Sequence, residues 1–132
     1  MVLKVSTPLE PEQEKVVSDA IDCGLDVHRV LGPGFREPIY HRAFCFELEA
    51  RGISFECEVP IEVRYKQWRI SGQRIDLIVA KVVLVELKAV KHLKQLHTSQ
   101  VVSYLKTTGL RVGLLMNFNG LRLKDGLKRI VL

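Results

Sequence analysis

Two carboxylates and a lysine lie in a mostly apolar stretch between residues 72 and 88, and their types suit an ion pair or a metal site. Glu86 and Lys88 are two residues apart, so on a strand they point to the same face. A buried charge is costly unless it is paired or holds a metal. One interpretation is a buried ion pair, in which Lys88 neutralises Asp76 or Glu86. The other is a divalent-cation site, with carboxylate ligands for Mg²⁺ or Mn²⁺ and the lysine beside a metal-bound water.

Two further sets of polar side chains have the spacing of neighbours on a helix face. Glu37 and Tyr40 are three residues apart, and Gln100 and Tyr104 are four apart with His97 on the same face. Each set alone has an ordinary structural explanation. An acid at a helix start is favoured by the helix dipole, a half-buried tyrosine is common, and polar residues along one face usually meet solvent.

The elements that would position these residues follow from the hydrophobic period along the chain. Broad apolar stripes predict three helices, and alternating or continuous apolar runs predict five strands. The apolar residues of the second helix predict that it is well buried, and alternation places those of the first strand on one side. The predicted helices span residues 12–31, 37–51 and 95–108, and the predicted strands span 54–65, 68–79, 82–90, 112–118 and 127–132.

The order of these elements indicates how the strands pair. Three consecutive strands, joined by short turns at residues 66–67 and 80–81, can form an antiparallel meander. The strand, helix and strand from residue 82 to 118 suit a right-handed parallel crossover. The sequence therefore predicts an α/β fold with a mixed β-sheet flanked by α-helices.

Length and composition bound the class of protein. The chain has 132 residues, 47% hydrophobic and 27% charged, which predicts one soluble domain over residues 1–132. No apolar run reaches the ~18 residues of a membrane span, and residues 1–14 lack the apolar core of a signal peptide. Three widely spaced cysteines without a C-x-x-C pair argue against a disulfide framework or a zinc site. We therefore expect a cytoplasmic protein with no membrane partner.

Charge is divided unevenly along the chain. Residues 1–62 contain 6 Lys and Arg against 12 Asp and Glu, a net charge of −6, whereas residues 63–132 contain 14 against 3, a net charge of +11. Such asymmetry indicates a polyanionic partner such as nucleic acid. The alternative is that the two oppositely charged parts pack together or pair between subunits.

In this order, the motifs resemble those of the GxxExxY family, within the PD-(D/E)XK nuclease-like superfamily. The resemblance runs from the first helix to Leu132, and it departs from the superfamily pattern in that no proline precedes Asp76. The motifs that carry it are Gly34, Glu37 and Tyr40, preceded by Leu31-Gly-Pro-Gly-Phe35, then Asp76 as the first aspartate, Glu86-Leu87-Lys88 as (D/E)-x-K, and Gln100 with Tyr104 as the Q-x-x-x-Y element of recombination-type exonuclease domains.

The resemblance implies a restriction-endonuclease-like fold and a nuclease that hydrolyses phosphodiester bonds with Mg²⁺ or Mn²⁺. Lys88 would orient the attacking water or neutralise charge on the phosphate. DNA is the expected nucleic-acid partner, with RNA open, and so small a domain could work as a homodimer or with another protein. The implied metal ligands are Asp76, Glu86, Glu37 and the Leu87 carbonyl, the implied catalytic residues are the same three acids with Lys88, and the implied substrate-binding residues are Tyr40, Gln100 and Tyr104.

Two alternatives use the same residues. The fold could serve as a non-catalytic nucleic-acid-binding or assembly module, in which Lys88 is one phosphate contact among several. Hydrolysis of another kind of phosphate ester would need the same carboxylates and lysine. Intact Asp76, Glu86 and Lys88 favour an enzyme over a silent module.

Overall fold

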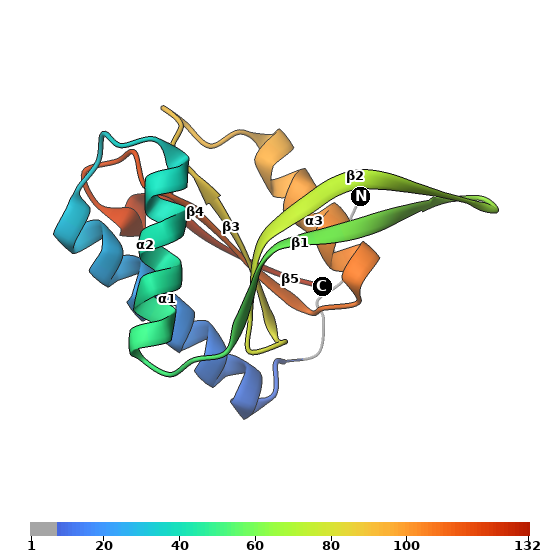
Figure 1. Ribbon diagram of the computed structural model, residues 1–132, viewed down its shortest axis with the longest axis horizontal. Helices are drawn as coiled ribbons and strands as arrows, with labels where there is room; N and C mark the ends of the chain where they lie inside the picture. Colours follow the sequence, from blue (N-terminus) through green and yellow to red (C-terminus); the bar gives the residue numbers. More distant parts are fainter. Residues whose placement is uncertain (1–7) are drawn as a thin grey trace.

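The computed structural model describes residues 8–132, and there it confirms the predicted order of helices and strands (Figure 1). The predictions of one domain over residues 1–132 and of no signal segment in residues 1–14 both include residues 1–7, which lie outside the described residues. No helix of the described range is long and apolar enough to cross a lipid bilayer. The elements are α1 (Pro11–Leu31), α2 (Glu37–Ala50), β1 (Phe55–Tyr65), β2 (Trp68–Val79), β3 (Val83–Lys88), α3 (Gln95–Thr108), β4 (Val112–Asn117), a short 3-10 helix η1 (Leu123–Gly126) and β5 (Leu127–Val131).

The strands of this range form one mixed sheet in the order β1-β2-β3-β4-β5. β1, β2 and β3 are antiparallel neighbours, β3 and β4 are parallel, and β5 returns antiparallel to β4. A parallel connection needs a long crossover, which α3 supplies, whereas antiparallel neighbours need only short turns. The predicted meander and parallel crossover are both confirmed. The short helix η1, by contrast, has no counterpart in the predicted elements.

Helices cover both faces of the sheet, with α1 and α2 on one face and α3 on the other (Figure 1). One hydrophobic core lies under α1 and α2 and includes Val85 and Leu87 of β3, while a second core under α3 includes Leu84. Because successive side chains of a strand point to opposite faces, Glu86 and Lys88 follow Leu84 onto the α3 face. The charged residues of β3 therefore open toward α3.

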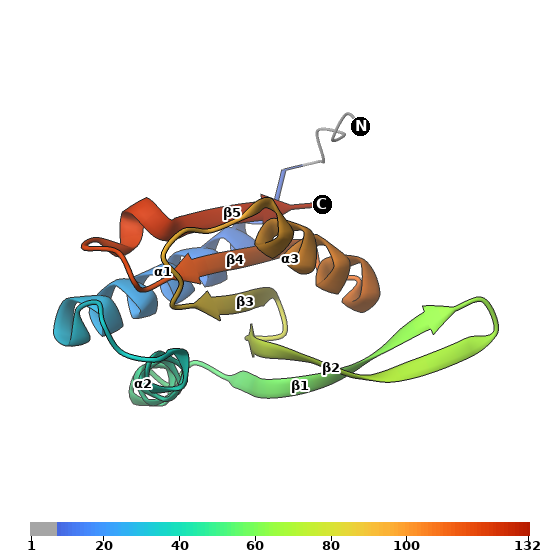
Figure 2. The same cartoon turned by 90° about the horizontal axis from the view of Figure 1, so that it is seen from above.

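The hairpin of β1 and β2 projects beyond the rest of the sheet as an arm, as Figure 2 shows. We define the arm as residues 62–73, all of which are exposed, with the predicted two-residue turn at its tip. A bulge shifts the register between Ile61 and Val63. Gly72, in the bulged part of β2, has a φ of 117°, a conformation that favours glycine.

Two predictions about side-chain burial are wrong. Phe46 is 59% exposed and Ile39 is 46% exposed, because α2 meets α1 and the sheet on part of its surface and solvent on the rest. The apolar residues of β1 do not stay on one side, since Phe55 packs under α1 and α2 whereas Val59 packs under α3. The change of side follows Glu58, whose positive φ of 50° interrupts the pleat.

The turn between β2 and β3 forms without glycine or asparagine. Ala80 and Lys81 both have positive φ, 51° and 60°, as the favoured two-residue hairpin turn requires. The Val82 N–H donates to the Val79 carbonyl at 2.9 Å and closes the turn. This tight turn fixes the register in which β2 faces β3.

β3 ends at Lys88, earlier than the sequence predicts. Beyond it, the buried side chain of Asn117 binds both backbone groups of Val90. Asn117 Oδ1 accepts the Val90 N–H at 3.0 Å, and Nδ2 donates to the Val90 carbonyl at 2.9 Å. The Asn117 side chain therefore makes the hydrogen bonds that a neighbouring strand would otherwise make, and it fixes the backbone directly after Lys88.

Candidate functional site

Asp76 stands where β2 separates from β3. Strand pairing ends with Leu77 opposite Val85, and the next amide of β3 facing β2, that of Leu87, donates to Asp76 Oδ2 at 2.9 Å. Ile75 and Leu77 are two residues apart yet lie in different hydrophobic cores, so the pleat of β2 breaks at Asp76. The carboxylate thereby replaces a strand partner and is held at the opening between β2 and β3.

The backbone of β3 presents a further oxygen to this opening. The Phe118 N–H donates to the Lys88 carbonyl at 2.9 Å, so the backbone of Lys88 faces β4. Backbone groups of adjacent strand residues face opposite edges of the strand, which directs those of Leu87 toward β2. The Leu87 carbonyl therefore lies on the same edge as the Asp76 carboxylate.

Glu86 points from β3 to the same side and is buried, with only 4% of its surface exposed. Its Oε2 lies 3.4 Å from Lys88 Nζ, while its Oε1 is buried with no hydrogen-bond partner in residues 8–132. Burial, and then the negative charge of Asp76, raises the pKa of Glu86 to about 8, and Lys88 opposes this only in part. The site thus contains two carboxylates, Asp76 and Glu86, and one basic side chain, Lys88.

This geometry bears on both interpretations of the charged stretch. The ion pair of Lys88 with Glu86 is present, but it leaves the charge of Asp76 and the Oε1 of Glu86 uncompensated. A buried polar oxygen without a partner is costly, and oxygen ligands with excess negative charge are those that Mg²⁺ prefers. The residues present therefore fit a divalent cation better than a closed ion pair.

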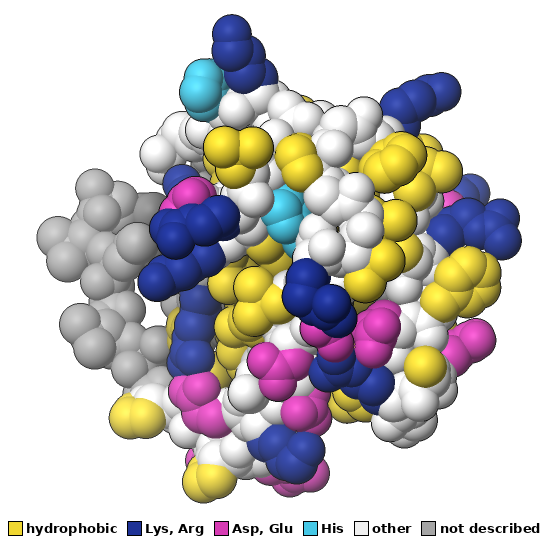
Figure 3. Space-filling view, turned by 90° about the vertical axis from the view of Figure 1, so that its left-hand side faces the viewer, with side chains coloured by type: hydrophobic (Ala, Val, Ile, Leu, Met, Phe, Trp, Pro, Cys, Tyr) yellow, Lys and Arg dark blue, Asp and Glu magenta, His cyan; other side chains and the backbone are white. Residues whose placement is uncertain are grey.

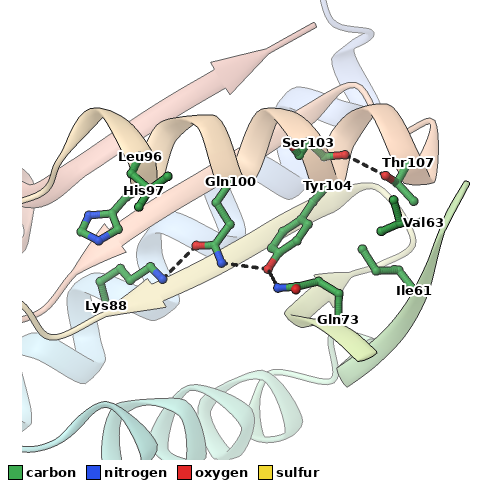
Figure 4. Close-up of a pocket in the computed structure, with 10 residues that line it drawn as sticks. All are labelled: Ile61, Val63, Gln73, Lys88, Leu96, His97, Gln100, Ser103, Tyr104 and Thr107. Atoms are coloured by element: carbon green, nitrogen blue, oxygen red, sulfur yellow. Dashed lines mark hydrogen bonds between the residues drawn. The ribbon is translucent and has the colours of Figure 1, made fainter. Parts of the chain in front are cut away.

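A chain of hydrogen bonds holds Lys88 and leads from β3 to α3 (Figure 4). Lys88 Nζ donates to Gln100 Oε1 at 2.9 Å, and Gln100 Nε2 donates to the Tyr104 hydroxyl at 2.9 Å. Gln73 on β2 donates to the same hydroxyl. Residues four apart on a helix are neighbours, so Gln100 and Tyr104 present one polar face of α3 to the sheet. The network fixes the ammonium group beside Glu86.

The Tyr104 hydroxyl keeps its own proton for another partner. It accepts from the amides of Gln73 and Gln100, and in residues 8–132 no acceptor takes its proton. Burial raises the pKa of Tyr104, and the nearby charge of Glu86 adds to this, so the hydroxyl stays protonated. Tyr104 can therefore donate to an oxygen atom of a bound molecule, such as one of a phosphate.

Glu37 approaches the same region from the N-terminus of α2, where the helix dipole favours an acid. Burial and then the charge of Asp76 raise the pKa of Glu37, while Lys88 partly opposes this, so Glu37 lies within electrostatic reach of both. Within the described range, however, no three side chains of His, Cys, Asp or Glu form a group that could hold a metal ion. What the structure shows of Glu37 at this site is therefore its electrostatic interaction with Asp76 and Lys88.

Tyr40, for which the resemblance implies a substrate-binding role, does not reach the surface in this structure. Its side chain is fully buried and stacks on Phe118, with the ring centroids 4.7 Å apart. Its hydroxyl donates to the Gly32 carbonyl at 2.7 Å and accepts from the Phe35 N–H at 3.1 Å. Tyr40 thereby ties the loop before α2 to that helix, and this loop sets the position of Glu37.

A groove of about 480 Å³ runs between α3 and the arm and reaches Lys88 at one end (Figure 4). Lys88, Gln100 and Tyr104, three of the residues singled out in the sequence, share its lining with Gln73. The groove therefore connects the charged site to a largely apolar channel along α3. Its other lining residues are Ile61, Val63, Leu96, His97, Ser103 and Thr107.

His97 and Gln73 belong to this site although the sequence gives them little weight. The Nδ1 of His97 accepts from the Lys94 N–H at 3.0 Å, which fixes the ring at the start of α3. Partial burial, and then the charge of Lys88, lowers the pKa of His97 and favours the neutral ring. Its spacing from Gln100 is a signal in the sequence, but Gln73 has none, because the bulge before it breaks the alternation that would assign its face.

The comparisons with known proteins agree with this geometry. A family model described as the PD-(D/E)XK nuclease superfamily matches residues 14–130, which include every residue of the site described above. No curated protein and no solved structure gives a significant match. The mixed five-stranded sheet with helices on both faces of it is the restriction-endonuclease-like α/β fold that the sequence predicts.

Proposed function

Because this chain belongs to the PD-(D/E)XK nuclease superfamily, we propose that it is a metal-dependent nuclease that hydrolyses phosphodiester bonds of DNA. The superfamily suggests a nucleic-acid substrate and generally uses divalent metals; the choice of DNA over RNA is part of the proposal. The observation that carries it is the buried Glu86 beside Lys88 and near the charge of Asp76, with one carboxylate oxygen of Glu86 that has no hydrogen-bond partner in residues 8–132.

Asp76, Glu86 and the Leu87 carbonyl are the groups that would hold Mg²⁺ or Mn²⁺, with Glu37 adding negative charge nearby. These are oxygen donors, and the unpaired Oε1 of Glu86 is the one whose burial a cation would compensate. A bound divalent cation would supply Lewis-acid polarisation of the phosphate and a more acidic water. Asp76 is held for this role by the Leu87 N–H, which leaves its second oxygen available.

Lys88 would offset the negative charge that develops on the phosphate. Its ammonium group is positioned before substrate arrives, since Gln100 and Glu86 hold it from two sides. Donors fixed in advance cost no reorganisation at the moment of reaction. The Tyr104 hydroxyl would donate a hydrogen bond to a phosphate oxygen, while Gln73 and Gln100 hold that hydroxyl in place.

We also assign the chain to the GxxExxY branch of the superfamily. In support, Gly34 has a φ of 111°, a conformation that favours glycine, in the loop that Tyr40 holds, and Glu37 begins the helix after that loop. One domain over residues 1–132 and a cytoplasmic site of action complete the proposal. A homodimer is the assembly to test, by sedimentation velocity over a range of protein concentrations.

One observation favours the alternative of a non-catalytic nucleic-acid-binding module. The Lys88 ammonium group already lies 3.4 Å from Glu86, and an ion pair of this kind can be purely structural. In a module of that type the site would bind nucleic acid through Lys88 and would not hydrolyse it.

The deciding experiment compares wild type with Lys88→Ala and, as a matched control, Lys91→Ala, which removes an exposed lysine just beyond β3. Labelled single- and double-stranded DNA and RNA are incubated with Mg²⁺ or Mn²⁺. We expect cleavage of DNA by wild type and Lys91→Ala, and a loss of about 10²–10³ in turnover for Lys88→Ala. Calorimetry should show metal binding retained or slightly tighter, because a cation repels Lys88.

Two results would contradict this assignment. Cleavage that is equal in wild type and Lys88→Ala would point to a contaminating nuclease. Binding of nucleic acid without cleavage under any metal condition would favour the non-catalytic module.

A further inference from the structure

The apolar lining of the groove continues along the arm, past the end of α3. Val59 and Ile61 pack against the core under α3, Val63 lines the groove, and Tyr65 follows two residues later on the same face. Tyr65 pairs across the hairpin with Trp68, and each of the two is 56% exposed. This row of apolar side chains is therefore part of the hydrophobic core at Val59 and is exposed to solvent at Tyr65, near the tip of the arm.

Tyr65 and Trp68 make a flat surface that the fold itself does not use. Their rings stack with centroids 6.4 Å apart and planes 19° apart, and Lys66 Nζ lies 5.3 Å from the centre of the Tyr65 ring. Neither ring belongs to either hydrophobic core. Exposed aromatic faces beside cations are a usual platform for unpaired bases, which stack on them regardless of sequence.

The arm also concentrates positive charge. Arg64 and Arg69 lie directly opposite each other on neighbouring strands, a position in which like charges destabilise a hairpin. No ion pair in residues 8–132 joins either arginine to an acid. Both border a second hollow, of about 470 Å³, with Lys106 of α3 and one acid, Glu62. A bound anion would relieve the repulsion between the arginines.

The opposite end of the molecule has a different mixture of side chains, although Phe46 there is also an exposed aromatic ring with a cation, Arg42, 5.7 Å from its centre. Figure 3 views the end that carries α1, α2 and η1, and it shows acidic and basic side chains intermingled with hydrophobic ones. In the arm, three basic residues stand against one acid. A second copy of this chain that met it arm to arm would bring these arginines together, so charge favours a polyanion as the occupant.

We propose that the arm binds a single-stranded segment of nucleic acid that leads into the groove. Bases stack on Tyr65 and Trp68, and the backbone phosphates lie against Arg64, Arg69 and Lys106. A duplex keeps its bases stacked on one another and leaves no free face for the aromatic pair, so the segment is unpaired. The proposal rests on the nuclease function proposed above and adds where the substrate strand runs.

Trp68 is the only tryptophan in the chain, which makes the test direct. The full-length protein carrying Asp76→Asn, which should bind without cleaving, is titrated with a thymidine homopolymer, a uridine homopolymer and a DNA duplex. We expect both single strands, or the DNA strand alone, to quench Trp68 fluorescence, and the duplex to leave it unchanged. The titration with the uridine homopolymer decides whether RNA binds at the same site.

Variants of the arm separate stacking from charge. Tyr65→Ala with Trp68→Ala should weaken single-strand binding, measured by anisotropy of the labelled strand, by about tenfold or more. Arg64→Ala with Arg69→Ala should lower the log–log salt slope by about 1.4, since each single-strand phosphate contributes about 0.7. Arg29→Ala with Lys124→Ala removes the same charge at the opposite end and should change neither quantity. Trp68→Phe keeps an aromatic face and should keep most of the affinity.

The outcomes distinguish this proposal from the nuclease proposal. If wild type cleaves and the arm variants bind like wild type, the path along the arm is wrong and the nuclease stands. Equal quenching by the duplex would overturn the single-strand assignment. A Trp68 signal that changes with protein concentration alone, and is lost together with a dimer in the arm variants, would make the arm a contact between copies. Absence of both binding and cleavage would overturn both proposals.

Discussion

At the scale of the residue, the charge around Lys88 governs both stability and function. Glu86 is buried with one oxygen unpaired, and Asp76 adds a second negative charge that the lysine does not balance. If the site receives a cation as proposed, the like charges of its carboxylates destabilise the protein when the cation is absent. Removing one carboxylate should therefore affect folding and metal binding in opposite directions.

We predict that Glu86→Gln stabilises the metal-free protein at about pH 8 and abolishes tight Mg²⁺ binding. The pKa of Glu86 rises from 4.5 to about 8 on folding, so the contribution of Glu86 to the stability of wild type is most favourable below about pH 4.5 and is lost as the pH rises through that window. Glutamine has no charge to bury, so the variant should lose less stability over the same range. Urea unfolding of both proteins in EDTA, from about pH 4 to pH 9, measures this. A variant less stable than wild type at about pH 8 would show that the pair with Lys88 dominates.

A second prediction separates the two tasks of Asp76. Asparagine can still accept the Leu87 N–H, whereas alanine leaves it without a partner. Both Asp76→Asn and Asp76→Ala should lose Mg²⁺-dependent cleavage, but only Asp76→Ala should lose stability, by about 1–3 kcal/mol. Thermal unfolding and cleavage are measured side by side. A loss of about 3–5 kcal/mol in Asp76→Asn would instead identify Asp76 as the partner in a buried ion pair.

The sequence predicts site residues correctly where they lie on a regular strand or helix, because their spacing along the chain then determines which face they share. Glu86 and Lys88 share a face because β3 is a regular strand, and Gln100 and Tyr104 share one because α3 is a regular helix. Tyr40 is different, since helical spacing places it near Glu37 but says nothing of the loop carbonyl that its hydroxyl binds. Contacts made by the end of a side chain with a distant backbone group leave no period in the sequence.

At the scale of the element, the site depends on how closely α3 lies on the sheet. Gly113 of β4 makes this approach possible, because a Cβ built there would lie 2.7 Å from Val101 Cγ1 on α3. Gln100 directly precedes Val101, and it is the residue that holds Lys88. The absence of a side chain at Gly113 therefore sets how closely α3, one wall of the groove, lies on β4.

We predict that Gly113→Ala displaces α3 and lowers both stability and cleavage. Overpacking of this kind costs about 1–3 kcal/mol, and the shift moves Gln100 and Tyr104 away from Lys88. Adding Val101→Ala removes the clashing methyl group and should restore much of the cleavage rate, although it leaves its own packing defect. Thermal unfolding and steady-state cleavage test this pair. Failure of the second substitution to recover any cleavage would separate the position of α3 from activity.

Element types and order could be predicted because the hydrophobic period changes clearly between helices and strands. Local irregularities could not, since Glu58 and Lys81 take positive φ without glycine and only the surrounding pairing imposes it. The exposure of Phe46 on α2 was equally hidden, because an apolar side chain does not reveal whether a neighbour covers it. The bends that shape the site are thus the part of the fold least visible in the sequence.

At the scale of the whole molecule, the division of charge along the chain becomes a division across the sheet. α1 and α2 on one face contain eight acidic and three basic residues, whereas α3 on the other contains Lys106 and no acid. Among the ion pairs of the described residues, that of Glu14 with Arg129 is the one that joins residues 1–62 to residues 63–132.

Binding of nucleic acid should accordingly weaken steeply with salt. Each neutralised phosphate contributes a log–log slope of about −0.9 on duplex DNA and about −0.7 on a single strand. Binding of labelled DNA to the Asp76→Asn protein in EDTA, over a series of KCl concentrations, gives the slope. An affinity that does not respond to salt would show that apolar contacts, not phosphates, hold the strand.

The tight turn at Ala80 and Lys81 has a consequence for the order in which the protein assembles. Asp76 and Leu87, whose N–H donates to the Asp76 carboxylate, lie 11 residues apart within one hairpin. Gln100, the residue of α3 that binds Lys88, follows later in the chain. Local hairpins form in about 1–10 μs, ahead of parallel pairing across a helical crossover. Asp76 and Glu86, the carboxylates proposed to bind the metal, should therefore meet on the nascent chain before the groove exists. A cation present during synthesis could then act as a folding nucleus, and refolding of the purified chain should be faster with Mg²⁺ than with EDTA.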